Sequence, residues 1–253
     1  MLKTDAGGVE GHGLSVLDVV KHALITVIRN LQEFDRLALV AYSNDARVIF
    51  ELTEMGQEGK QQCEQKLGDL RAAGMTNLWD GLKNGFELMK AGANQGRLQH
   101  VLLFTDGLPN INPPRGILPM LKRLKDASGG RLPCTINTFG FGYELDSELL
   151  SQLAIEGAGA YAFIPDAGFV GTVFVNAMSN LLVSMAKEVT LTLTPQNGAS
   201  FVGSGVLGGH PELKTNDEAA KCVGVGALQF GQAKNVVVQM RVPPAAVSGG
   251  YLR

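Results

Sequence analysis

The sequence predicts an α/β fold, in which a doubly wound, mostly parallel sheet has helices on both faces and is followed by a partial β-rich segment. Up to about residue 186, short apolar runs alternate with stretches whose apolar residues recur at the helical period. Several of these runs are apolar without interruption, which is typical of parallel strands covered on both faces. After Lys187 the helical period disappears, and alternating β segments separated by glycine-rich stretches replace it.

These patterns divide the chain into three parts. Residues 1–13 are rich in glycine and polar side chains, so we expect a flexible N-terminal loop. Residues 14–186 carry the α/β pattern and form the main domain. Residues 187–253 form the β-rich segment, with strands expected over 188–195 and 235–243. This last part is short for a closed β-sandwich, and we expect it to be one portion of such a sandwich.

The first half of the main domain begins with a helix over about 14–32, where Ser15 and Asp18 form a capping-box pattern. The elements expected next are strands over 35–43 and 46–52 and helices over 57–72 and 77–91. Gly81 and Gly85 lie one turn apart on the last of these helices. Each glycine costs about 1 kcal/mol of helix propensity relative to alanine. We therefore expect compensation from close packing of the backbone against a neighbour.

The second half of the domain continues the alternation. The elements expected are a strand over 98–107, a helix over 117–127, a strand over 134–142, a helix that begins at Asp146 and stops at Gly157, a strand over 160–164 and a helix over 168–186. The Val-Leu-Leu-Phe run at 101–104 suits a central parallel strand, and the strand ends in a Thr-Asp-Gly turn.

Composition excludes several classes of protein. The chain has 22 basic and 24 acidic side chains, a formal net charge of −2, which provides no basic surface for nucleic acid. No apolar stretch is long and unbroken enough to cross a membrane. Cys63, Cys134 and Cys222 are odd in number and lack the Cys-x-x-Cys spacing, so we interpret them as reduced, mostly buried thiols. A cytoplasmic location is expected.

Two residues are candidates for a binding site. Asp106 follows the central apolar strand, and Thr76 lies in a Gly-Met-Thr-Asn turn at a helix start. In open α/β sheets, ligands bind beyond the carboxyl ends of the strands. A hydroxyl and a carboxylate suit Mg²⁺, Mn²⁺ or Ca²⁺ better than zinc. The purely structural alternatives are a helix N-cap for Thr76 and a turn-stabilising carboxylate for Asp106.

Several stretches of residues 14–186 resemble the von Willebrand factor type A (vWA) domain family. They are DRLALVAYSNDARVIFEL, GMTNLWDGL, LLFTDGLPNINPPRG, INTFGFGYELDSELL and AYAFIPDAGFVGTVFVNAMSNLL. These stretches are most similar to the corresponding sequences of intracellular members of the family. The resemblance implies a Rossmann-like fold and a metal-ion-dependent adhesion site (MIDAS). Its threonine loop falls on Thr76 and its aspartate loop on Asp106.

The first part of that site, an Asp-x-Ser-x-Ser motif at the end of the first central strand, does not occur in the sequence. We therefore expect an N-terminally incomplete vWA domain, a fragment that lacks this strand. In the family the strand lies between the strands expected here near 36–42 and 99–104. The resemblance thus implies a gap or an altered pairing between them.

Two functions of different classes follow. The first is a non-enzymatic protein–protein interaction module with a degenerate MIDAS, in which Thr76 and Asp106 hold Mg²⁺ (or Mn²⁺ or Ca²⁺) weakly and an acidic side chain of the protein partner completes the shell. The alternative is a Mg²⁺-dependent hydrolase or phosphotransferase that uses Asp106. That reaction needs a second acid or base, for which Asp80 and Asp45 are the candidates.

Overall fold

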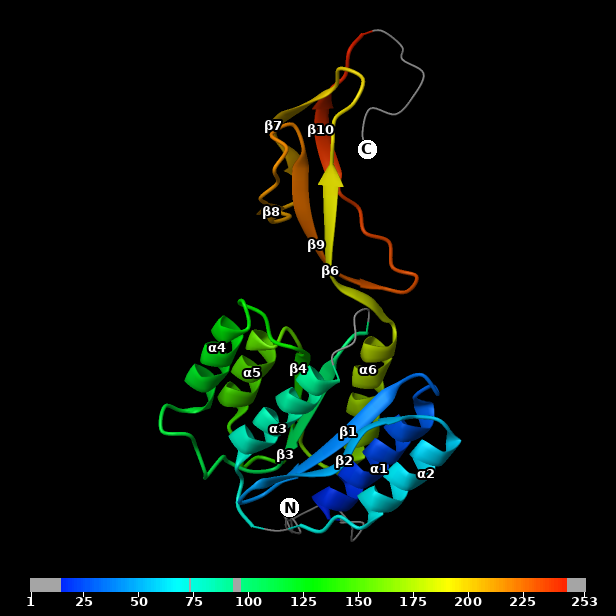
Figure 1. The fold of residues 1–253 in the computed structure, drawn as a ribbon, viewed down its shortest axis with the longest axis vertical. Helices are drawn as coiled ribbons and strands as arrows, with labels where there is room; N and C mark the ends of the chain where they lie inside the picture. Colours follow the sequence, from blue (N-terminus) through cyan, green and yellow to red (C-terminus); the bar gives the residue numbers. More distant parts are fainter. Residues whose placement is uncertain (1–14, 73, 93–96, 245–253) are drawn as a thin grey trace. The chain divides into compact units, whose positions relative to one another are not determined.

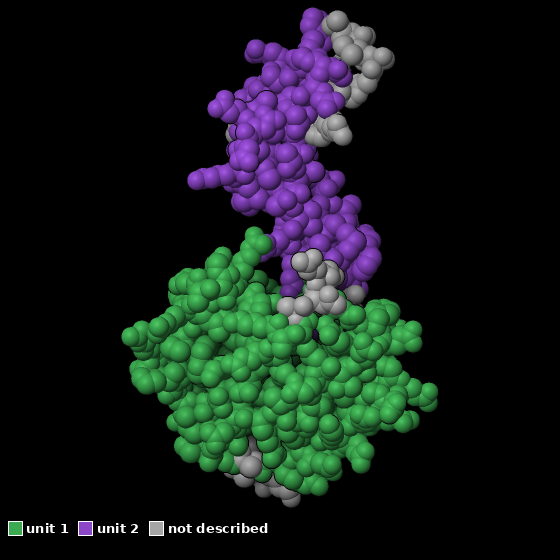
Figure 2. Space-filling view, viewed as in Figure 1, with its two compact units in different colours: residues 1–178 green, residues 179–253 purple. Residues whose placement is uncertain are grey.

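A computed structural model describes residues 15–72, 74–92 and 97–244 of the chain. It divides into two compact units, unit 1 over residues 1–178 and unit 2 over residues 179–253 (Figure 2). The two units are described separately below. The predicted loop over residues 1–13 lies outside the described residues.

Unit 1 begins with a helix and a hairpin. The helix α1 (Val16–Asn30) starts at the predicted capping box of Ser15 and Asp18. The strands β1 (Arg36–Tyr42) and β2 (Ala46–Glu54) pair antiparallel, as the sequence predicts. The helix α2 (Gln57–Gly68) follows and lies beside α1 (Figure 1).

A parallel sheet forms the centre of unit 1. Its strands are β3 (His100–Thr105), β4 (Thr135–Phe141) and β5 (Tyr161–Ile164), in the order β3-β4-β5. The helices that connect and flank them are α3 (Leu78–Ala91), α4 (Ile117–Ala127), α5 (Ser147–Glu156) and α6 (Val170–Leu182), the last preceded by the short 3-10 helix η1 (Ala167–Phe169). The predicted α/β architecture is confirmed.

Helices cover both faces of this sheet. On one face, α3, α4 and α5 bury a cluster that includes Leu82, Leu121 and Leu153 against Leu103 and Ile136. On the other face, α1 and α6 bury a second cluster against the strands, in which three phenylalanine rings each contact the ring of Phe104. Those three rings belong to Phe139, Phe141 and Phe174. Successive side chains of β3 pack alternately into the two clusters, which explains the unbroken apolar run of this strand.

The sheet of unit 1 is interrupted where the family resemblance implies a gap. Within the described ranges, β1 pairs only with β2, and β3 pairs only with β4. Every residue of β1 is only half-buried, although its sequence is that of a strand covered on both faces. The expected lack of pairing between the 36–42 and 99–104 strands is therefore confirmed.

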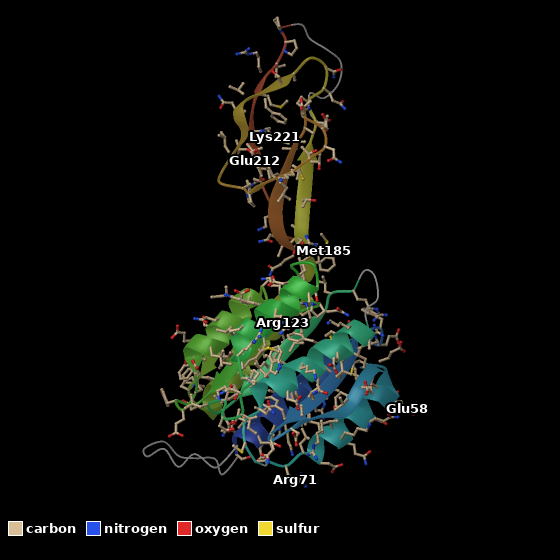
Figure 3. The ribbon with its side chains drawn as sticks, turned by 60° about the vertical axis from the view of Figure 1, so that its left-hand side comes forward. Glu58, Arg71, Arg123, Met185, Glu212 and Lys221 are labelled. Carbon is tan, nitrogen blue, oxygen red and sulfur yellow. The ribbon has the colours of Figure 1, made fainter. Side chains whose placement is uncertain are left out.

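In the described residues that follow α6, unit 2 is built from β-strands. Its strands are β6 (Ser184–Leu193), β7 (Ser200–Leu207), β8 (Glu212–Leu213), β9 (Lys221–Gln229) and β10 (Val237–Arg241). They form an antiparallel sheet of order β6-β9-β8 and a separate antiparallel pair of β7 and β10. An ion pair between Lys221 Nζ and Glu212 Oε2, at 3.2 Å, links β9 to β8 (Figure 3).

The structure corrects the sequence analysis at two places in this region. The last helix ends at Leu182 and not near 186, because Ser184 already pairs with Gln229 in the sheet. The glycine-rich stretches also form strands, namely β7 and β9, which the sequence analysis treated as separators. Gly203, Gly205 and Gly226 adopt positive φ angles of 62°, 79° and 80° within them. Glycine permits such irregular strands, and their periodicity is correspondingly weak.

Candidate functional site

The loop that carries Thr76 is fixed by the start of α3. The side chain of Asn77 accepts a hydrogen bond from the backbone N–H of Asp80, at 3.2 Å, and is the N-cap of the helix. The structural alternative for Thr76 was therefore wrong: the residue next to it caps the helix. The hydroxyl of Thr76 does not cap the helix, and Thr76 is half-buried at the end of the loop.

Two reciprocal hydrogen bonds hold the threonine loop (residues 74–77) against the aspartate loop (residues 106–116). We call this pair of bonds the clamp. The backbone N–H of Thr76 donates to Asn110 Oδ1 at 2.7 Å, and the backbone N–H of Asn110 donates to the Thr76 carbonyl oxygen at 3.2 Å. The Thr76 hydroxyl oxygen lies 3.6 Å from the position that a Cβ on Gly107 would occupy. Since Gly107 is the neighbour of Asp106, the structure brings the two predicted site residues into adjoining loops.

The turn between β1 and β2 holds the threonine loop from the other side. Asn44 Oδ1 accepts the backbone N–H of Met75 at 2.9 Å, and Asn77 Nδ2 donates to the Asn44 carbonyl oxygen at 3.0 Å. Gly74 has a φ of 69°, and a Cβ there would lie 2.5 Å from Asn44 Oδ1. Glycine is thus needed both for the backbone conformation and for the close approach.

Asp106 follows β3 directly, and its turn is tightened by Thr105, whose hydroxyl donates to the Gly107 carbonyl oxygen at 3.2 Å. The Tyr42 hydroxyl lies nearby and donates to the Phe104 carbonyl oxygen at 2.6 Å. Burial of this hydroxyl raises the pKa of Tyr42 well above its usual value, and the negative charge of Asp106 adds to the shift. The phenol is therefore a neutral donor at the base of the site.

The acid–base partners required by a hydrolase are poorly placed. Asp80 Oδ2 accepts the backbone N–H of Ala46 at 2.7 Å, so this carboxylate joins α3 to the β1–β2 hairpin. Asp45 is exposed in the hairpin turn, where its carbonyl oxygen accepts the backbone N–H of Ser43. Neither residue offers a carboxylate dedicated to proton transfer beside Asp106, and the geometry does not favour the enzymatic alternative.

The donor set at the site fits a weakly held hard cation. Thr76 and Asp106 would contribute one neutral and one anionic oxygen, which are the ligand types of Mg²⁺. Among the residues that the structure describes, no group of three or more His, Cys, Asp or Glu side chains could hold a metal ion. Most of the six positions around Mg²⁺ would therefore be filled by water or by a ligand from outside the chain.

Comparison with known proteins identifies the family. The von Willebrand factor type A domain matches residues 9–174, well over half of the chain. The chain belongs to the von Willebrand factor type A family. The vWA match covers α1 to the first turns of α6 and includes both loops of the candidate site.

Curated relatives are distant and much longer. The chain is 28% identical to YfbK of Escherichia coli K12 over 176 residues, which are 68% of this chain and 29% of that protein. It is 28% identical to human inter-alpha-trypsin inhibitor heavy chain H3 over 56% of this chain and 16% of that protein. The Arabidopsis thaliana protein named "Probable E3 ubiquitin-protein ligase WAVH2" is 23% identical over 95% of this chain and 32% of its own length. The chain thus spans about a third or less of each of these relatives.

Solved structures agree with the fold. A von Willebrand factor type A protein from Catenulispora acidiphila superimposes with a TM-score of 0.65 at 17% identity, over 92% of this chain and 55% of that one. Proximal thread matrix protein 1 from the mussel byssus, solved with zinc in its MIDAS motif, gives a TM-score of 0.55 at 17% identity, over 69% of this chain and 44% of that one. The identities are low, so these likenesses show the fold alone.

Sequence reasoning missed the residues that hold the site together. Asn110 and Asn44 accept backbone N–H groups of the threonine loop, and Tyr42 ties β1 to β3. Asparagine in a turn-rich stretch was the available signal, since its side chain commonly bonds loop backbone. The partner of each asparagine is more than 30 residues away in sequence, and no local pattern identifies it.

Proposed function

We propose that the chain is a non-enzymatic protein–protein interaction module that presents the face formed by Thr76, Asp106 and the β1–β2 turn to a partner. The clamp between Thr76 and Asn110 is the observation that carries this proposal. It joins the loop that carries Thr76 to the loop that follows Asp106, at the carboxyl end of β3, and open α/β sheets bind ligands at such ends. The vWA membership supports an interaction role for this face.

The proposed metal chemistry is that of a degenerate MIDAS. Thr76 and Asp106 would hold Mg²⁺, Mn²⁺ or Ca²⁺ with a shell made mostly of water, because the sequence contains no Asp-x-Ser-x-Ser segment. When bound, the ion would supply a positive centre that accepts a carboxylate from the partner. Affinity for the ion alone should be low, since binding depends on the number of ligands held in a preformed shell.

A peptide-binding measurement tests this function. We expect a labelled synthetic peptide with one central glutamate to bind the full chain in excess Mg²⁺, and its glutamine counterpart to bind much more weakly. Asp106→Ala should abolish the difference between the two peptides. Glu58→Ala is the matched control, because it removes an exposed carboxylate from α2, outside the proposed face. Equal binding of both peptides, or a glutamate preference that survives Asp106→Ala, would refute the proposal.

Calorimetric titration with Mn²⁺ tests the weakness of the site directly. We expect no saturable binding in the micromolar range and no rise in melting temperature on adding the ion. Micromolar binding that is lost in Asp106→Ala would show that the site is complete without the missing motif. Turnover of phosphate esters with Mg²⁺ or Mn²⁺, lost in the same variant, would instead establish the hydrolase.

The cellular setting of this interaction is proposed from the cysteines. Cys63, which is buried, and Cys222 are thiols and not disulfides, which is the form that the sequence predicts for a reducing compartment. Over the described part of the chain, no helix has the length and apolar character needed to cross a membrane. On the basis of the thiols, we propose that the protein acts in the cytoplasm.

A further inference from the structure

An exposed pair of aromatic rings lies at the carboxyl end of the parallel sheet. Tyr143 follows β4 and is 80% exposed, and Phe163 in β5 is 39% exposed. Their ring centroids are 5.5 Å apart, with an angle of 64° between the planes, which is an edge-to-face contact. The two rings therefore form one aromatic surface on unit 1.

The backbone holds both rings outside the core. Ala162 and Ile164 pack into the phenylalanine-rich cluster, so the strand alternation directs Phe163 to the opposite side of β5. Gly142 has a φ of 75°, and its N–H donates to the Ile164 carbonyl oxygen at 2.9 Å. This turn carries Tyr143 away from β4 while keeping it next to the end of β5.

The segment of the chain that carries both rings has charged side chains of one sign. Residues 132–186 contain five acidic side chains and no Lys, Arg or His, while the whole chain has a net charge of only −2. Glu156 is neutralised by Lys122 and Lys125 of α4. Glu144, next to Tyr143, and Asp166, which follows the end of β5, are both exposed. The segment that carries the aromatic pair therefore contributes only negative charge, with Glu144 and Asp166 as its exposed carboxylates nearest in sequence to the two rings.

We propose that Tyr143 and Phe163, with Glu144 and Asp166, form a docking surface for an arginine side chain in a basic segment of a partner protein. An aromatic face attracts a guanidinium through its quadrupole, and the neighbouring carboxylates add favourable charge. Arginine fits better than lysine because its planar group stacks on rings and is more weakly hydrated. This surface involves neither Thr76 nor Asp106 and goes beyond the acidic contact proposed for that site.

The test is fluorescence polarisation with a labelled peptide of alternating arginine and glycine, using the full chain. A second peptide carries citrulline, which replaces the charged guanidinium by a neutral urea of the same shape. We expect the arginine peptide to bind and the citrulline peptide to bind at least about fivefold more weakly. Binding of the arginine peptide should weaken as salt is added, since the carboxylates are exposed.

Variants separate the aromatic contribution from simple apolar contact. Tyr143→Leu should lower affinity for the arginine peptide about two- to fivefold, whereas Tyr143→Phe, which keeps the ring, should bind as the wild type does. Glu144→Gln with Asp166→Asn should lower affinity and flatten the salt dependence. Phe34→Leu is the matched control, because Phe34 is 65% exposed elsewhere on unit 1 and its carbonyl oxygen accepts a hydrogen bond from Arg97.

Three outcomes would overturn the proposal. They are equal binding of the arginine and citrulline peptides, unchanged binding by Tyr143→Leu, and a loss in Phe34→Leu as large as that in Tyr143→Leu. Asp106→Ala should leave arginine-peptide binding intact even where it abolishes the glutamate preference, so failures of the two proposals can be told apart. Thermal melts of each variant check that the exposed substitutions leave the fold unchanged.

Discussion

The hydroxyl of Tyr42, the last residue of β1, donates a 2.6 Å hydrogen bond to the carbonyl oxygen of Phe104 in β3. The two strands belong to separate sheets. A side chain thus satisfies a backbone acceptor of β3 on the side where the ladder is interrupted.

The Tyr42→Phe variant should show how much this hydrogen bond contributes to the free energy of unfolding. Removing the hydroxyl leaves the Phe104 carbonyl oxygen without this donor in a partly buried position, and we expect the free energy of unfolding to fall by about 1–2 kcal/mol. Chemical denaturation measures the change. Tyr161→Phe is the control, since its hydroxyl bonds Ser147 Oγ at an exposed position, and its effect should stay below about 1 kcal/mol. Similar losses in both variants would contradict this role for Tyr42.

Stability should also fall at high pH because of Tyr42. Burial raises the pKa of this phenol in the folded state above its usual value of 10. Above pH 10 the unfolded chain releases the proton while the folded chain retains it, so the unfolding free energy should decrease by up to about 1.4 kcal/mol per pH unit. Below pH 10 this contribution does not vary. Denaturation curves from pH 8 to 11 should show a shallower decline in Tyr42→Phe, and identical slopes would exclude Tyr42 as the cause.

Gly81 and Gly85, on the same helix, should respond to alanine in opposite directions. A Cβ on Gly81 would lie 2.7 Å from Cδ1 of Tyr42, whereas one on Gly85 would lie 3.8 Å from Cγ2 of Val101. We expect Gly81→Ala to destabilise the fold by about 1–3 kcal/mol through overpacking. Gly85→Ala should stabilise it by up to about 1 kcal/mol through helix propensity. Melting temperatures that move in the same direction would refute the assigned packing.

Asn110→Ala should loosen the candidate site more than it destabilises the domain. The loss of one loop hydrogen bond should cost about 0.5–1.5 kcal/mol. The clearer effect should be faster hydrogen exchange at the Thr76 amide, which Asn110 Oδ1 accepts at 2.7 Å. Asn112→Ala is the control in the same loop, because its side chain bonds only the nearby Pro109 carbonyl oxygen. NMR exchange rates for the Thr76 amide that are equal in the two variants would contradict the clamp.

Most of unit 1 could be predicted because its signals are local. The apolar run at 101–104 and the caps at Ser15 and Asp146 correspond to β3, α1 and α5. The packing expected for Gly81 is found against Tyr42, while Gly85 makes only an ordinary contact. The strand and the caps depend on residues that are neighbours in sequence, whereas the identity of the residue that packs against Gly81 does not follow from the sequence.

The failures share a different cause, since each depends on a distant partner. The early end of α6 follows from the pairing of Ser184 with Gln229. Thr76 and Asn77 are both good capping residues, and only the docking of Asn77 against Ser43 and Asn44 determines which one caps α3. The approach of Thr76 to Asp106 was implied by family resemblance, whereas the asparagines that enforce it had no local pattern.

The missing ladder between β1 and β3 also affects how unit 1 can unfold in part. Within the described residues, the β1–β2 hairpin is joined to the parallel sheet through side chains and the packing of α1 and α3, with no shared backbone ladder. Contacts of that kind can separate without dismantling the ladders on either side. The hairpin and α2 should therefore behave as a subdomain that detaches reversibly at a lower free energy than global unfolding. The hairpin turn supports the threonine loop, so each detachment of the hairpin would also disrupt the binding face. A bound ligand would therefore make detachment of the hairpin less frequent.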